Sequence, residues 1–303
     1  MASPSAPDTS PDAALRRIVA NCRDDLLKYR AIALASRRPI GIHQTRVALR
    51  RLRAAFGTFR EVAAGAIGRR ELTALSAEAK WLAGECAPAR DLHVFLTEIA
   101  QNAPPVVIKV GRRLAKSHLE RARTALSSTR FSMFEGALSA FAEQAPATPL
   151  VGSGGGRLDD FGRGMLDRRA TKVDKSGRKL GSLDGKRLHA LRIAIKKLRY
   201  AATFLQPAFA RRPFDSRAAK AYIEATVRLQ GALGTLNDRA VAGQMMADIA
   251  VAARPSEDVG GALRTLAKQA ASGEKRRRHR LQQAWKQFRK AGRFWHRKET
   301  EPT

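Results

Sequence analysis

The sequence has few cysteines and no long apolar segment. Cys22 and Cys86 are the only cysteines among 303 residues, too few for a disulfide framework and wrongly spaced for a zinc site, which favours a reducing compartment. Cys22 lies in a segment of apolar periodicity, which predicts a small core residue rather than a nucleophile. Because no apolar run reaches about 18 residues, we expect no membrane-spanning helix.

Acidic and aromatic residues are also scarce. Asp and Glu total 27 against 57 Lys and Arg, a formal net charge of +30, and only 6% of the residues are aromatic. Such an excess of positive charge favours a polyanionic partner, which could be nucleic acid, an anionic membrane surface or an inorganic polymer. Composition alone does not choose among the three.

The first residues lack the features of a targeting segment. Residues 1–12 are rich in Pro, Ser and Ala, with neither the basic start nor the apolar core of a signal peptide. We therefore predict a disordered tail over 1–12, a second tail over 296–303 and a cytoplasmic protein.

Alternating β-branched residues, the usual signature of strands, are nearly absent, whereas helical periodicity is found almost throughout. The 44% hydrophobic content is enough for one large domain or for two similar halves. We predict an all-α fold, with helices in the first half over 13–36, 43–64, 71–83, 88–100 and 105–141. In the second half we expect helices over 158–179, 217–233 and 259–291. Asp184 is expected to cap a further helix that contains residue 189, and another helix is expected to run from a break at Gly234 to residue 252.

A segment of eleven residues occurs twice, at 43–53 and at 189–199. Five of the eleven paired positions are identical and four more are conservative exchanges, which indicates an internal duplication. Since a helix advances about 100° per residue, the basic residues of each copy share one face, with Arg51 or Lys197 at its edge. The two stripes are His43, Arg46, Arg50 and Arg53 in the first copy, and His189, Arg192, Lys196 and Arg199 in the second.

A basic stripe of this kind is usually a solvated helix face. Solvated faces mix charges of both signs, however, whereas the stretch from Arg46 to Arg60 carries five arginines with no acid before Glu61. Like charges at i and i+4 cost roughly 0.2–0.5 kcal/mol per pair. Because both copies keep this arrangement, we interpret the stripes as faces that bind an anion.

The duplication extends beyond these segments. Leu-Ala-Gly at 82–84 followed by Arg-Asp at 90–91 corresponds to Leu-Gln-Gly at 229–231 followed by Asn-Asp at 237–238. We therefore predict two four-helix bundles, over 13–143 and 157–295, related by an approximate two-fold axis. Between them, residues 144–156 are rich in Pro and Gly, which predicts a flexible linker.

The repeated residues resemble the CHAD family, named for its conserved histidine α-helical domain. Its two hallmark strings resemble 43–53 and 189–200, and an Arg-Asp-Leu-x-Val string matches 90–94, so that the resemblance covers roughly residues 12–295. It implies paired four-helix bundles with a basic central surface, binding of inorganic polyphosphate, association with polyphosphate or storage granules, and no catalysis by this domain. The chain departs from the family at His93, where an acid is usual, and at 237–239, where Asn-Asp-Arg replaces Arg-Asp-Leu. It also lacks the Glu-x-Glu-x-Lys signature of the triphosphate-tunnel enzymes that often accompany the family.

Polyphosphate carries about one negative charge per phosphoryl unit and no bases, so a protein that binds it needs a row of cationic donors. The two stripes are expected to line a basic central groove that binds the polymer. Cations on the last helix of each half are expected to extend it, and Arg277 either reaches this groove or pairs with an acid such as Asp238. We expect no cofactor and no metal site. The predicted polyphosphate-binding set is His43, Arg46, Arg50, Arg51, Arg53, Arg90, Arg112, Arg113, Lys116, Arg123, His189, Arg192, Lys196, Lys197, Arg199, Arg277 and Arg280.

His43 and His189 allow three interpretations: contact with the anion, a structural hydrogen bond, or metal ligation. Neither His43 nor His189 has a second ligand on its own stripe, which disfavours a metal. Asp91 and Asp238 are expected to orient arginines or to favour a helix start rather than to act as catalytic acids.

The basic run at 275–280 offers an alternative, a nucleic-acid patch. Phe288, Phe294 and Trp295 are expected to belong to the core rather than to a platform on which bases stack. Three hypotheses follow: a non-catalytic polyphosphate-binding module with granule proteins as further partners and no membrane contact, a nonspecific nucleic-acid-binding protein, and an accessory subunit of a phosphate-metabolising enzyme.

Overall fold

The computed structural model describes residues 10–36, 38–62, 65–144, 157–209 and 213–296, without the side chains of 65–67, 213–215, 236–240 and 270–271. Within these residues the fold is all-α, as predicted, with no strand. The first half contains α1 (Pro11–Ala35), α2 (Ile40–Thr58), α3 (Gly65–Val94), the π-helical turn η1 (Phe95–Ile99), α4 (Pro105–Ser127) and α5 (Thr129–Glu143). The second half contains α6 (Leu158–Ser176), the 3-10 turn η2 (Leu180–Ser182), α7 (Gly185–Phe209), α8 (Pro213–Ala252), α9 (Gly260–Ala271), α10 (Glu274–Lys290) and the 3-10 turn η3 (Phe294–His296).

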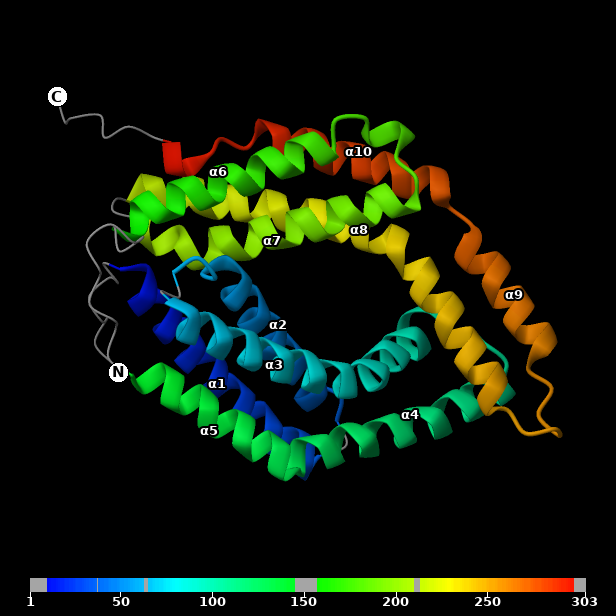
Figure 1. Cartoon of the computed structure of the whole chain (residues 1–303). Helices are drawn as coiled ribbons and strands as arrows, with labels where there is room; N and C mark the ends of the chain where they lie inside the picture. The colour runs from blue at the N-terminus through cyan, green and yellow to red at the C-terminus, as the bar shows by residue number, and fades with distance from the viewer. Residues whose placement is uncertain (1–9, 37, 63–64, 145–156, 210–212, 297–303) are drawn as a thin grey trace.

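The helices are arranged as a ring, in which the two halves meet at two places (Figure 1). At the first, α2 packs against α7 and α1 against α6 within the main apolar core. At the second, α3, η1 and α4 pack against α8 beside α9. A separate apolar cluster fills this second contact: Leu92, Phe95, Ala100, Val107, Val110, Ala242, Met245, Ile249, Val259, Leu263 and Leu266. The ring therefore places α2 of the first half beside α7 of the second.

The expected break at Gly84–Pro88 is wrong, since α3 continues through both residues. A proline inside a helix removes one backbone hydrogen bond and costs about 3 kcal/mol. Leu82, Cys86 and Leu92, on both sides of the proline, are fully buried, and packing of this continuous apolar face outweighs the local penalty. Likewise α8 runs through Gly234 without a break, with Leu229 and Leu233 buried before it.

The last predicted helix of each half is in fact divided into two. The first division falls at Ser128, whose hydroxyl accepts a hydrogen bond from Phe131 N at 3.2 Å and so caps α5. The second falls at Gly273, whose φ of 74° is the left-handed conformation that glycine adopts at little cost. Within the described residues each half consequently has five α-helices, which is consistent with the predicted duplication.

Several local predictions are confirmed. Asp184 caps α7, because its carboxylate accepts a hydrogen bond from Arg187 N at 2.8 Å. Cys22 is fully buried with a free thiol, and burial raises its pKa to about 12. Phe288 and Trp295 lie in the core. The predicted tails and linker fall almost entirely on residues 1–9, 145–156 and 297–303, outside the described part of the chain.

Candidate anion-binding site

The two repeated segments meet through a tyrosine. Arg50 Nε on α2 donates a hydrogen bond to the Tyr200 hydroxyl on α7 at 3.0 Å. The Arg199 guanidinium lies 4.4 Å from the centre of the Tyr200 ring, and Arg199 Nε donates to Gln230 Oε1 at 2.8 Å. Tyr200 is only 5% exposed, so its ring is held firmly while it contacts arginines of both copies.

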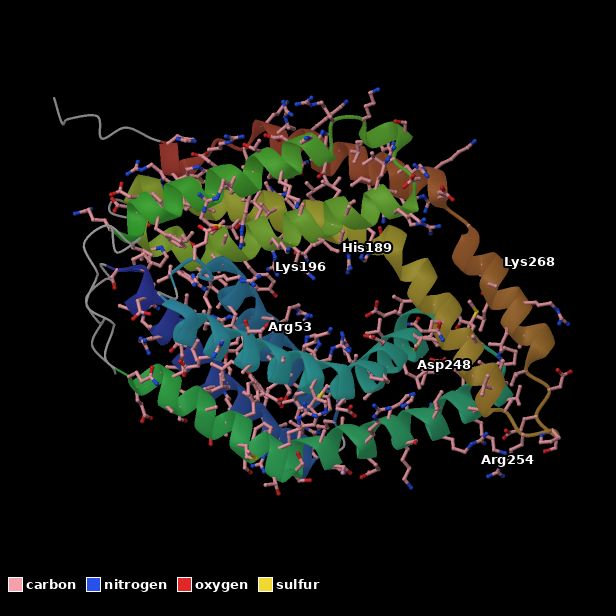
Figure 2. The ribbon with its side chains drawn as sticks, in the orientation of Figure 1. Arg53, His189, Lys196, Asp248, Arg254 and Lys268 are labelled. Atoms are coloured by element: carbon pink, nitrogen blue, oxygen red, sulfur yellow. The ribbon has the colours of Figure 1, made fainter. Side chains whose placement is uncertain are left out.

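Lys196 lies at the centre of the surface that the two stripes form. It is half-buried, and burial together with the surrounding cations lowers the pKa of its ammonium group. Those cations come from both copies: Arg192, Arg53, Arg50 and Lys197, in decreasing order of effect. Figure 2 shows Arg53 and Lys196 on the inner side of the ring. Cations of both stripes thus lie together around Lys196.

His189 and Arg192 continue the second stripe towards the start of α7. His189 is exposed and lies on the same inner side as Lys196 (Figure 2). Arg192 is half-buried. The cationic surface therefore extends along more than one turn of α7.

The first stripe is widened by residues of α3. His43, Arg90 and His93 are half-buried and close enough that burial, then mainly Arg90, lowers the pKa values of both histidines. Asp91 Oδ1 lies 3.2 Å from Arg46 Nη1, so this acid orients an arginine, as the sequence suggested.

Equivalent arginines of the two copies each carry a buried donor atom. Arg192 Nε has no hydrogen-bond partner among the described residues, whereas Arg46 Nη1 lies 3.2 Å from the Asp91 carboxylate, with which it forms an ion pair. A buried donor without an acceptor costs roughly 1–3 kcal/mol, and most such groups in proteins are satisfied. No described residue accepts a hydrogen bond from Arg192 Nε, which leaves this donor open to an anion.

Comparison with models of protein families matches residues 17–247 to the CHAD domain. The chain belongs to this family. The matched residues include α2, α3 and α7, the helices that carry the two stripes and Arg90.

Two solved structures share the fold. The crystal structure of the CHAD domain from the plant Ricinus communis is similar with a TM-score of 0.78 and 24% identity, over 96% of this chain and 95% of that one. PptA from Streptomyces chartreusis is similar with a TM-score of 0.61 and 17% identity, over 92% of this chain and all of that one. At these identities the likeness shows the fold alone. No curated protein matches the chain.

Several residues of the predicted polyphosphate-binding set make contacts elsewhere. Arg113 forms two hydrogen bonds of 2.9 Å with Glu257 and one of 2.7 Å with Ala252 O, at the second contact of the ring. Arg123 donates to the carbonyls at residues 33 and 34, at the end of α1, at 2.9 and 3.0 Å. Arg51 pairs with Asp25 at 3.2 Å. These three arginines hold helices together, and the structure does not bring them into the α2–α7 surface.

The remaining predicted cations are also separate from that surface. Arg277 and Arg280 lie on α10, which packs against α8 and η2 at the outer rim of the ring (Figure 1). The suggested partner Asp238 is among the side chains that the structure does not describe. Arg112 and Lys116 are exposed on α4.

One residue that joins α2 to α7 was not predicted from the sequence. Arg169 on α6 donates to Thr58 Oγ1 at 3.1 Å, to Gly57 O at 2.9 Å and to Lys197 O at 2.7 Å. It joins both basic helices, and burial lowers its pKa to about 10. No local pattern marks such a residue, because its partners are distant in the sequence. His93 could have been included, since it follows Arg90 by one helical turn.

Two structural findings concern other kinds of site. The described residues contain no group of three or more His, Cys, Asp or Glu side chains that could hold a metal ion. None of the described helices combines the length and apolarity needed to cross a membrane.

Proposed function

We propose that this protein binds inorganic polyphosphate, without catalysis, on the surface formed by α2, α7 and Arg90. The observation that carries the proposal is the cluster of cations from both stripes around the half-buried Lys196, beside the buried Arg192 Nε, which has no partner among the described residues. These cations lie on the two helices that α2–α7 packing brings together. A row of phosphoryl oxygens would supply an acceptor to Arg192 and opposite charge to the whole cluster.

The electrostatics of the surface support a repeating anion. Lys196 is surrounded by four cations from both stripes, and no carboxylate is among the groups that influence its pKa. Holding like charges together in a half-buried place is unfavourable in the free protein. A polymer with one negative charge per unit would relieve this repulsion along the whole surface. Arginine forks hold phosphate oxygens in pairs, while lysine supplies a mobile charge.

Polyphosphate suits the surface better than nucleic acid does. Proteins that bind single strands without sequence preference use exposed aromatic rings on which bases stack. All described aromatic side chains are buried or half-buried, and Phe288, Phe294 and Trp295 contact one another or Tyr222 in the core. Membership in the CHAD family supports the same choice, because the resemblance implies polyphosphate. We accordingly place the protein at polyphosphate granules in the cytoplasm.

A competition experiment tests the proposal against its main alternative. Labelled long-chain polyphosphate is bound to the purified protein at about physiological ionic strength, about 0.15 M, and is challenged with unlabelled polyphosphate, duplex DNA or RNA of equal charge concentration. We expect polyphosphate to displace the label and nucleic acid to fail. Equal displacement by all three would favour the nonspecific nucleic-acid-binding protein.

A further inference from the structure

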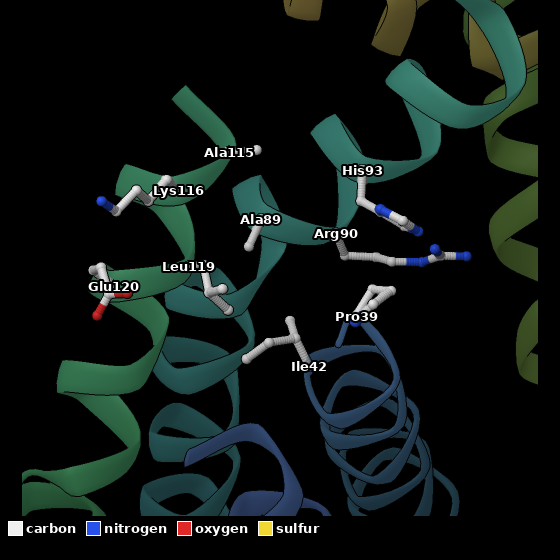
Figure 3. Close-up of a pocket in the computed structure, with 9 residues that line it drawn as sticks. All are labelled: Pro39, Ile42, Ala89, Arg90, His93, Ala115, Lys116, Leu119 and Glu120. Carbon is white, nitrogen blue, oxygen red and sulfur yellow. The ribbon is translucent and has the colours of Figure 1, made fainter. Parts of the chain in front are cut away.

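A pocket of about 310 Å³ lies between the start of α2, α3 and α4, beside the first stripe. Its floor is apolar, and charged side chains lie at both ends (Figure 3). Lys116 and Glu120 stand at one end, and Arg90 and His93 at the other. The apolar residues between them are Pro39, Ile42, Ala89, Ala115 and Leu119.

The Arg90 end of the pocket carries positive charge that has no partner. Neither Arg90 nor His93 makes an ion pair or a side-chain hydrogen bond with any described residue, and both are half-buried. The other end carries charges of both signs, because Glu120, which pairs with Arg123 at 3.5 Å, follows Lys116 by one helical turn. An anionic group is therefore favoured beside Arg90 and His93, with an apolar body extending over Ala89 and Leu119.

We propose that this pocket binds a small organic phosphate with an apolar body, as a second ligand site that adjoins the polymer surface at Arg90. The volume is within the range of small-molecule sites, which combine an apolar lining with a few polar groups that fix orientation. A nucleoside body fits poorly, because the floor between the two charged ends offers no polar side chain to the edges of a base. Inorganic phosphate fits poorly as well, because it leaves the floor unoccupied.

Arg90 belongs to both sites. Besides lining the pocket, it lies close enough to His43 and Arg46 to lower the pKa values of both. An organic phosphate paired with Arg90 would neutralise a charge that the polymer surface uses. The two ligands should therefore weaken each other's binding, and this second part of the inference rests on the proposed polyphosphate function.

Alkyl phosphates of increasing length test the pocket directly. Ethyl, butyl and hexyl phosphate are titrated into the protein by calorimetry, with inorganic phosphate and hexanol as the two half-probes. Burial of each methylene strengthens binding by up to about fourfold, so affinity should rise from ethyl to hexyl phosphate, and each half-probe should bind at least about tenfold more weakly than hexyl phosphate. Equal affinity for inorganic phosphate and hexyl phosphate would overturn the proposal.

Variants locate the binding. Ala115→Phe fills the pocket and should abolish the dependence on chain length while polyphosphate affinity stays unchanged. Arg90→Gln should weaken both ligands, and Lys268→Ala, on α9, should change neither. Retention of full hexyl phosphate affinity by Ala115→Phe would contradict the inference.

A measurement on the unaltered protein keeps the test independent of how the variants fold. A photoreactive aryl azide phosphate should label residues 89–93 or 115–120, and labelling confined to other segments would refute the site. None of the alkyl phosphate measurements requires the polymer, so failure of the protein to bind polyphosphate would leave the pocket intact, and the reverse also holds.

Discussion

The Tyr200 hydroxyl accepts a hydrogen bond from Arg50 Nε at 3.0 Å, and this contact links the second copy of the repeated segment to the first. The tyrosine cannot easily move, because its buried ring stacks on Phe204 with centroids 5.9 Å apart. Arg50 is itself exposed, so without the tyrosine its side chain would sample many rotamers. The α2–α7 surface thus combines residues of both halves, and Arg50 of the first half is oriented by a residue of the second.

Tyr200→Phe should weaken polyphosphate binding without unfolding the protein. The change keeps the ring and its contact with Arg199 but removes the acceptor for Arg50, a loss of about 0.5–1.5 kcal/mol or roughly two- to tenfold in affinity. Binding is measured for the parent, Tyr200→Phe, Arg50→Ala and the double variant. Tyr200→Phe should have little effect on affinity in the Arg50→Ala protein. If Tyr200→Phe weakens binding equally with and without Arg50, the tyrosine does not act by orienting that arginine.

Polyphosphate affinity should fall steeply with salt. For single-stranded polyanions the slope of log K against log salt is about −0.7 per neutralised phosphate. Arg192→Ala should therefore make the slope shallower by about 0.7. Lys268→Ala on α9 serves as the control and should leave the slope unchanged. Identical slopes for the parent and Arg192→Ala would show that Arg192 neutralises no phosphate.

Binding should take up protons near neutral pH. Burial and neighbouring arginines hold the pKa values of His43 and His93 below 6.5, so both are neutral in the free protein at pH 7. A bound polyanion favours the charged imidazole, and since the bound-state pKa then exceeds the free-state pKa, affinity should rise as pH falls from about 7 to 5.5. Calorimetry in two buffers of different ionisation enthalpy counts the protons. His43→Gln should reduce the uptake, and affinity that is constant between pH 5 and 8 would argue against protonation.

The stability of the free protein should fall over the same pH range in which affinity rises. The lowered histidine pKa values mean that the unfolded chain binds more protons than the folded chain just below pH 6.5. The contribution of these groups to stability is therefore fully present above that pH and is lost as pH falls towards their folded values.

Arg113 should prove structural. Its hydrogen bonds hold the pKa of Glu257 at about 2, against an ordinary 4.5. The stability that this pair provides is complete above pH 4.5 and is lost as pH falls towards 2, so Glu257→Gln should lower the Tm at pH 7 and by less at pH 3. Arg113→Gln should likewise lower the Tm while polyphosphate affinity stays within about twofold of the parent. A large loss of affinity in folded Arg113→Gln would return this residue to the site.

The stripes were predictable because helical spacing alone determines which side chains share a face. The face that is shared by His43, Arg46, Arg50 and Arg53 was predicted without tertiary information. The repeat also implied a paired arrangement, in which the second stripe lies beside the first. Most of the helices were also predicted. The errors are the breaks expected at Pro88 and Gly234, where packing outweighs the local preference, and the divisions at Ser128 and Gly273, which were missed.

Residues whose role depends on distant partners were not predictable. Arg113 and Arg123 look like stripe residues on α4, yet each finds an acceptor on another element: Glu257 before α9 and the end of α1. Arg169 carries no local signal at all, although it contacts both basic helices. Periodicity gives the face of a side chain, whereas the fold decides whether a carboxylate or carbonyl already occupies that face.

The most direct test compares two variants that lose the same number of positive charges. The first carries Ala at Arg46, Arg50, Arg192 and Lys196. The second carries Ala at Lys175, Lys179, Lys268 and Lys286, all exposed on other elements and without an ion pair among the described residues. Affinity for long-chain polyphosphate is measured at one salt concentration, with circular dichroism to confirm folding. The first variant should lose most of its binding, and the second should bind as the parent does. Equal losses in both folded variants would show that net charge, and not the α2–α7 surface, holds the polymer.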